Sequence, residues 1–360
     1  MARGLVPTAT AAALAGCLVL SACSSSGGVA SPQAPVSRSV GPSDPYGASA
    51  SPTVATPSAT RTTAPVTPAP STAPAGPRAP SVSEARAILK EYNDRKNVGA
   101  NAPNKQNYAL ADGGFLLEYD DWRAQLEVAL AAKRGKLQPL GPVTYTLDDV
   151  LGWSKEGGLE MLVLSVSKRE PAGGSSVVMV LARGDGQPWI NVAEAGQADD
   201  IRPASPLGTI SPANPGVVGA VQTYFMNGQV PPGVSLSDYF TPYQPPFDNS
   251  NPSLSSQFNV SVTCVAFNPG HAWQMPVSGN QVLTIVIPRC ATDLSARTSD
   301  VYITPAIDDE AESQGLTKSS KLRAIHEVEV RATAVVTAGD KHVWSGGFPA
   351  KIVKSQYVPR

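Results

Sequence analysis

Residues 81–92, Ser-Val-Ser-Glu-Ala-Arg-Ala-Ile-Leu-Lys-Glu-Tyr, begin the ordered part of this chain and predict a helix. Ser81 and Glu84 have the spacing of a capping box, in which each side chain binds a backbone amide that the helix start leaves without a partner. The apolar residues that follow recur at helical spacing: Ala85, Ile88, Leu89 and Tyr92. The stretch therefore predicts a helix with one apolar face.

A second helix is expected from about Tyr119 to Lys133. Its apolar stripe consists of Trp122, Leu126, Ala129 and Leu130. Gly135 is placed to end the helix in a left-handed conformation.

Four strands are predicted next, at Val143–Leu151, Leu159–Lys168, Ser176–Arg183 and Pro188–Glu194. Short turns at Gly157-Gly158 and Asp185-Gly186 suit hairpins. Helices followed by an antiparallel meander indicate an α+β fold, with the helices packed on one sheet. Residues 81–201 are therefore expected to form a first α+β module.

A proline-rich joint at residues 202–215 separates this module from a second α+β module at residues 216–360. A helix is expected from about Gly216 to Asn227. The strands expected after it are Phe258–Phe267, Val282–Ile287, Ile325–Thr337 and His342–Lys354.

Two of the four cysteines, Cys264 and Cys290, lie in the second module. Outside the cytoplasm such a pair is expected to be oxidised, so a structural disulfide between them is predicted. A simple hairpin of the two neighbouring predicted strands would place Cys264 opposite about Ile285. The disulfide therefore requires an offset or a bend in the sheet.

The segment before the ordered part predicts secretion and lipidation. Residues 1–22 have a positively charged N-terminal end followed by an uncharged apolar run, as in a signal peptide. Leu20-Ser21-Ala22-Cys23 has the pattern of a lipobox, at which Cys23 is acylated, for example with palmitate, and becomes the first residue. Leu14-Ala15-Gly16-Cys17 is an alternative lipobox, and secretion without lipidation is a further alternative. Cleavage at Cys23 is preferred because a polar segment begins directly after it.

Residues 23–80 form a tether rich in Ala, Pro, Ser and Thr. Such a composition offers too little apolar side chain to offset the entropy of ordering, so the tether is expected to be disordered. The chain is therefore expected on the outer face of a bacterial cytoplasmic membrane, held there through Cys23.

Composition and motifs argue against several classes of function. The formal net charge is −1, which gives no basic footprint for nucleic acid. The sequence lacks a Gly-x-Ser-x-Gly elbow, a phosphate loop and a His-Glu-x-x-His motif. His326 is interpreted as a core histidine, and the acidic run at 308–312 as a solvated loop. No catalytic, cofactor or metal residue is assigned.

Ala85 to Ala124 resembles the opening of the extracytoplasmic domain in a family of uncharacterised actinobacterial lipoproteins. The resemblance rests on the Tyr92-Asn93 and Trp122-Arg123 pairs, and the chain departs from the family pattern at Gln106–Gly114. It implies tandem cone-shaped modules of the NTF2-like or cystatin-like kind, and it implies no activity.

Three functions remain after these observations. The preferred one is a non-enzymatic lipoprotein that binds a protein or another envelope component. The alternatives are a small-ligand binder that uses the pocket of an NTF2-like cone and, third, a hydrolase or isomerase built in such a cone. The aromatic stretch Tyr239–Phe247 is either a contact surface or a cover over the sheet edge.

Overall fold

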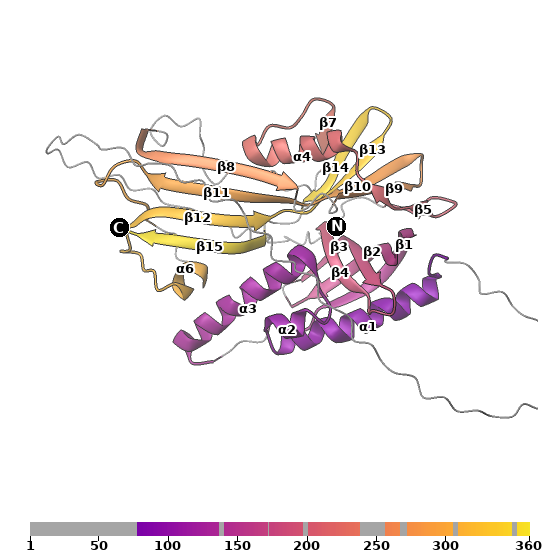
Figure 1. Ribbon diagram of the computed structural model, residues 1–360, viewed down its shortest axis with the longest axis horizontal. Helices are drawn as coiled ribbons and strands as arrows, with labels where there is room; N and C mark the ends of the chain where they lie inside the picture. Colours follow the sequence, from indigo (N-terminus) through magenta and orange to yellow (C-terminus); the bar gives the residue numbers. More distant parts are fainter. Residues whose placement is uncertain are drawn as a thin grey trace, which may run out of the picture. The chain divides into compact units, whose positions relative to one another are not determined.

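The computed structural model describes residues 78–136, 140–171, 173–196, 201–237, 256–266, 272–304, 309–347 and 351–360. The chain from Ala79 to Arg360 belongs to one compact unit, coloured from indigo to yellow in Figure 1. Its described part has few helices and three mainly antiparallel sheets, which confirms the predicted α+β class. The predicted signal peptide, both lipoboxes, nearly all of the tether and the Tyr239–Phe247 stretch lie outside the described residues.

Helix α1 (Val82–Asn101) begins with the predicted capping box. The Glu84 amide donates to Ser81 Oγ at 3.3 Å, and the Ser81 amide donates to Glu84 Oε2 at 2.7 Å. Of the predicted apolar face, Ala85, Leu89 and Tyr92 are buried. The first quoted stretch therefore forms the helix that its residues predict.

Helices α2 (Lys105–Tyr108) and α3 (Gly114–Arg134) follow. Helix α3 begins earlier than predicted and ends, as predicted, at Gly135, whose φ of 80° is left-handed. Its buried face consists of Phe115, Leu116, Asp120, Ala124 and Leu130. The remaining members of the predicted stripe, Trp122, Leu126 and Ala129, are only half-buried.

The first sheet has the strand order β4-β3-β2-β1-β5. The predicted meander corresponds to β1 (Thr144–Glu156), β2 (Leu159–Glu170), β3 (Gly173–Gly184) and β4 (Ile190–Gly196). The short strand β5 (Gly208–Thr209) pairs in parallel with β1.

The central strands of this sheet are buried on both faces. On β2, Leu162 and Leu164 belong to the hydrophobic cluster that contains α1, whereas Val163 belongs to a cluster shared with strands of the second half. The continuous apolar runs of β2 and β3 are explained by this double burial.

The second half contains α4 (Pro215–Asn227), the short helix α6 (Asp309–Ser313) and two sheets. One sheet has the order β6-β9-β10-β13-β14-β7, and the other has the order β15-β12-β11-β8. The strands of the first are β6 (Ser211–Pro212), β7 (Val234–Leu236), β9 (Ala272–Val277), β10 (Gln281–Val286), β13 (Thr333–Ala338) and β14 (Lys341–Gly347). Those of the second are β8 (Phe258–Ala266), β11 (Pro288–Ala296), β12 (Leu322–Val330) and β15 (Lys351–Pro359).

Consecutive strands pass from one of these sheets into the other. Only Ile287 separates β10 from β11, and only Arg331 and Ala332 separate β12 from β13. The predicted single strand Ile325–Thr337 is therefore two strands, one in each sheet. Figure 1 shows this passage where β11 and β12 meet the ends of β10 and β13.

The disulfide between Cys264 and Cys290 is present, as predicted. The two cysteines are directly opposed in the antiparallel pairing of β8 with β11. The strand that contains Cys264 does not form a hairpin with Val282–Ile287, because β10 pairs with β9 and β8 pairs with β11. The disulfide was expected to require an offset or a bend in the sheet. The chain makes this bend where it passes from β10 in one sheet to β11 in the other.

The two predicted modules meet across a shared hydrophobic core. Apolar residues of the first sheet and of α3 pack against Trp273, Met275 and Ile285 of the six-stranded sheet. The proline-rich joint contributes to this contact through Gly208, which pairs with β1. A Cβ at Gly208 would lie 2.4 Å from the Pro276 carbonyl oxygen, so only glycine permits this approach.

Candidate functional site

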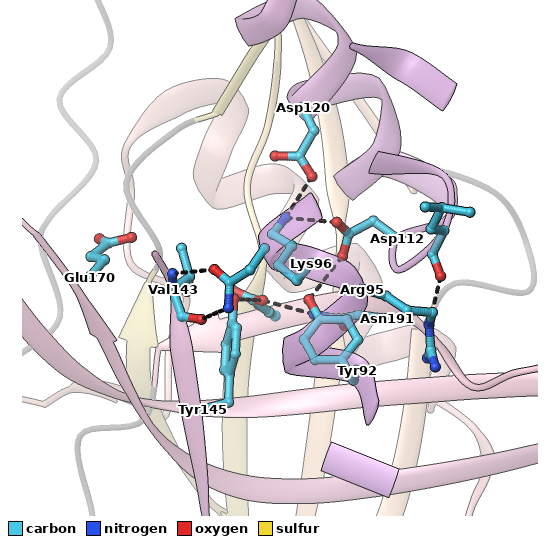
Figure 2. A network of polar contacts seen from close by, with 12 residues as sticks. Tyr92, Arg95, Lys96, Asp112, Asp120, Val143, Tyr145, Glu170 and Asn191 are labelled. Atoms are coloured by element: carbon cyan, nitrogen blue, oxygen red, sulfur yellow. Dashed lines mark hydrogen bonds and ion pairs between the residues drawn. The ribbon is translucent and has the colours of Figure 1, made fainter. Parts of the chain in front are cut away.

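The first candidate is a buried polar network between α1, the segment before α3 and the first sheet (Figure 2). Lys96 Nζ lies 2.7 Å from Oδ2 of Asp112 and 2.7 Å from Oδ2 of Asp120. The Tyr92 hydroxyl donates to Asp112 Oδ1 at 2.9 Å. One ammonium group on α1 thus holds two carboxylates.

The network continues to the sheet through Asn191. Asn191 Nδ2 donates to the Tyr92 hydroxyl at 3.2 Å and to Glu194 Oε1 at 2.8 Å. The Tyr145 hydroxyl donates to the same Glu194 oxygen at 2.6 Å, and Lys168 Nζ lies 3.4 Å from Oε2. Each of these groups is therefore joined to at least one partner of opposite charge or complementary hydrogen bonding.

Burial sets the proton affinities in this network. Desolvation raises the pKa of Asp112 to about 7, with Asp120 adding to the rise and Lys96 opposing it. Burial lowers the pKa of Lys96, but the charges of Asp112 and Asp120 outweigh that effect and leave this pKa well above its usual value. Burial and the Glu194 charge raise the pKa of the Tyr145 hydroxyl.

The network has the character of a structural centre. Asp112, Asp120 and Glu194 are 2%, 6% and 2% exposed, and none of them lines the groove described below. A reacting molecule would have to displace their present partners. This centre was not predicted from the sequence. Lys96 does follow Leu89 and Tyr92 at helical spacing on the apolar face of α1, and a lysine on such a face is a signal for a paired buried charge.

The second candidate is an open groove of about 450 Å³ between α3, α6 and β15. Figure 1 shows the three elements beside one another, with α3 running below β15. The residues that line the groove come from α3 (Glu118, Asp121, Trp122, Gln125, Leu126, Ala129), from α6 and the residue after it (Glu310, Ser313, Gln314) and from β15 (Lys354, Ser355).

The apolar part of the lining is the half-buried stripe of α3. Trp122, Leu126 and Ala129 follow one another at helical spacing, so their side chains share a face. The Tyr119 ring stacks on the Trp122 indole with a centroid separation of 6.4 Å and an interplanar angle of 26°. This contact restricts the orientation of the indole at the groove.

The polar part of the lining is largely balanced in charge. Glu118 lies 2.9 Å from Arg289 Nη1, and Asp121 lies 3.3 Å from Lys105 Nζ. Lys354 adds a positive charge on the opposite wall, where Glu310 is buried. The carboxylates of Glu118 and Asp121 are therefore each paired with a cation.

Helix α6 is fixed against the end of α3 by ion pairs. Arg134 Nη2 lies 2.7 Å from Asp309 Oδ1 and 2.6 Å from Glu312 Oε2. The pKa of Glu312 is lowered, chiefly by its hydrogen bond with Arg134. The interpretation of the acidic run as a solvated loop is wrong for Asp309, Glu310 and Glu312, because they belong to a helix, and Glu310 lines the groove. Asp308 lies outside the described residues.

The interpretation of His326 as a core histidine is also wrong. Its side chain is 34% exposed, and its Nδ1 contacts Asp293 on the neighbouring strand. The register of β12 against β15 shifts between Leu322 and Ala324 and again between Val328 and Glu329. Neither shift lies between His326 and Val328, and Val328 and Val330 on the same strand are buried as inferred; His326 differs because it lies opposite Asp293 and contacts its carboxylate.

The remaining predicted site residues are placed in different ways. Cys264 and Cys290 belong to the cluster packed beneath α4. Cys23, the predicted lipidation site, lies outside the described residues. None of the helices in the described part of the chain is long and apolar enough to cross a bilayer.

Comparison with known proteins gave no match to a family model, to a curated protein or to a solved structure.

Proposed function

We propose that this chain is a non-enzymatic, lipid-anchored binding protein on the outer face of a bacterial cytoplasmic membrane. Its task would be to hold an envelope component in the groove between α3, α6 and β15. Cys23 would carry the lipid anchor, and residues 23–80 would carry the folded part away from the membrane.

The observation that carries this proposal is the composition and size of the groove. A volume of about 450 Å³ lies in the range of about 300–1,000 Å³ that is typical of small-ligand pockets. An apolar strip on α3 faces a wall of polar side chains on α6 and β15. Such a lining binds by surface complementarity and by several hydrogen bonds.

The proposed location is supported by the lipobox and by the disulfide. The disulfide between Cys264 and Cys290 suits an oxidising compartment. The lipobox and the tether point to the same compartment on sequence grounds.

The proposal includes the tandem modules that the resemblance to actinobacterial lipoproteins implies. In the first half, α1 packs on an antiparallel meander, and in the second half, α4 packs on strands that pass from one sheet to the next. Both arrangements are of the α+β kind, and the proposal takes each half to be an NTF2-like or cystatin-like module. The groove, however, lies between elements of the two halves, so binding would require both of them.

Capture of envelope fragments by the detergent-solubilised mature protein tests the proposed function. Leu126 lines the groove, whereas Val128 is 57% exposed on another face of the same helix. Leu126→Arg should reduce capture about tenfold, because a charged side chain would replace part of the apolar strip that the ligand covers. Val128→Arg, the matched control, should capture as much as the wild type. Equal capture by all three proteins would contradict the proposed function.

A further inference from the structure

The groove is lined both by hydrogen-bond donors and acceptors and by apolar side chains. Its polar groups include the carboxylate of Asp121, the amides of Gln125 and Gln314, the hydroxyl of Ser355 and the ammonium of Lys354. Gln314 Nε2 donates to Ser355 Oγ at 3.1 Å, which leaves the Gln314 carbonyl oxygen as an acceptor and the Ser355 hydroxyl as a donor. A ligand that satisfies such a mixed set must itself both donate and accept hydrogen bonds. Hydroxyl and amide groups have this property, whereas ionised carboxylates, ionised phosphates and ammonium groups lack it.

The apolar strip further limits the class of ligand that fits the groove. Trp122 presents an indole at the groove, and Leu126 and Ala129 extend the apolar surface by two helical turns. A sugar ring has a face of C–H groups and a rim of hydroxyls. The C–H face would pack on the indole while the hydroxyls reach the polar wall. The Tyr119 ring keeps the indole in position for this contact.

Charge balance argues against an ionic ligand. Arg289 neutralises Glu118, and Lys105 neutralises Asp121. Lys354 and Glu310 then contribute one charge of each sign. A phosphorylated or polycationic ligand would find no net charge of opposite sign in the groove. An uncharged ligand needs no such charge to bind.

We infer that the groove binds a neutral carbohydrate of the cell envelope, with Trp122 stacked on a sugar ring and the polar wall bound to its hydroxyls. This inference rests on the proposed function, since it names the chemistry of the component that the groove holds.

Selective destruction of the envelope material tests the inference. Envelope fragments are treated either with a broad protease or with periodate, which cleaves the carbon–carbon bond between adjacent hydroxyls of a sugar. The immobilised mature protein is then offered each sample. Capture should survive the protease and fall to background after periodate. Capture that is lost to the protease, or that survives periodate, would overturn the carbohydrate assignment.

Variants of the groove complete the test. Trp122→Ala should weaken capture about fivefold or more, and Trp122→Phe should retain part of it, because a smaller ring still stacks. Gln125→Ala, at an exposed position, should weaken capture without affecting the fold, as checked by an unchanged Tm. Val128→Ala serves as the control on the same helix. If Leu126→Arg abolishes capture and periodate does not, the proposed function stands and only the carbohydrate inference fails.

Discussion

Lys96 Nζ lies 2.7 Å from a carboxylate oxygen of Asp112, and both side chains are buried. Asp120 Oδ2 also lies 2.7 Å from Lys96 Nζ. Helix α1, the segment that precedes α3, and α3 itself are therefore joined through one lysine. Two negative groups around one positive group make this part of the core dependent on that lysine.

Replacing Lys96 with Met should destabilise the fold strongly. The substitution leaves two buried carboxylates without their cation, and loss of one partner of a buried pair costs about 3–5 kcal/mol. Urea unfolding followed by circular dichroism measures this change. The control is Lys90→Met, because Lys90 and Asp94 form an exposed pair on the same helix, and such pairs contribute little. Similar losses in both variants would show that Lys96 has no special role.

Stability should fall as the pH rises towards neutrality, because of Asp112. Its pKa in the folded state is about 7, above the ordinary value of 3.8, so the folded state holds more protons between these values. The contribution is complete below about pH 4 and is lost as the pH rises through about 7, at up to about 1.4 kcal/mol per pH unit. Unfolding measured at intervals from pH 4.5 to 7.5 should show this slope.

The variant Asp112→Asn provides the comparison for that experiment. It removes the titrating group and keeps its size, so its slope between pH 4.5 and 7.5 should be smaller than that of the wild type. An equal slope in the two proteins would assign the pH dependence to other groups.

Removing the disulfide should cost about 2–4 kcal/mol, because the bridge restricts the unfolded chain. The cysteines are 26 residues apart in sequence and lie opposite each other on β8 and β11. Cys264→Ala with Cys290→Ala should lower the free energy of unfolding by this amount. Reduction of the wild-type protein should lower it similarly, and an unchanged midpoint after confirmed reduction would contradict the prediction.

Anchoring should depend on Cys23. Cys23→Ala is expected to release the protein from the membrane fraction, because no acylated cysteine remains at the mature terminus. Cys17→Ala should remain with the membrane. Fractionation and immunoblotting measure both, and the opposite distribution would assign the lipid to Cys17.

Local structure was largely predictable from the sequence. The capping box at Ser81 and Glu84 forms, and the turns at Gly157-Gly158 and Asp185-Gly186 join the strands that were predicted around them. These features depend on neighbouring residues alone. The prediction was less successful where long-range contacts decide the position of a side chain, as at His326, which contacts Asp293 on the neighbouring strand and is partly exposed.

In the candidate sites too, local patterns were predictable from the sequence and long-range contacts were not. Trp122, Leu126 and Ala129 have the spacing of a buried stripe, and the spacing is correct. How far these side chains are buried depends on β15, which lies more than two hundred residues later in the sequence and leaves a groove along α3. Lys96 is likewise buried only because Asp112 and Asp120 are brought to it.

By itself the sequence determined the α+β class, the positions of most elements and the cysteine pair. It also predicts that the protein lies at a membrane surface. Caps, turns and hydrophobic periodicity act over a few residues and can be read along the chain. The tertiary structure alone decided the pairing of β8 with β11, the buried charge network and the groove. Each of these brings together side chains that are distant in sequence, and their energies depend on burial, which no local pattern specifies.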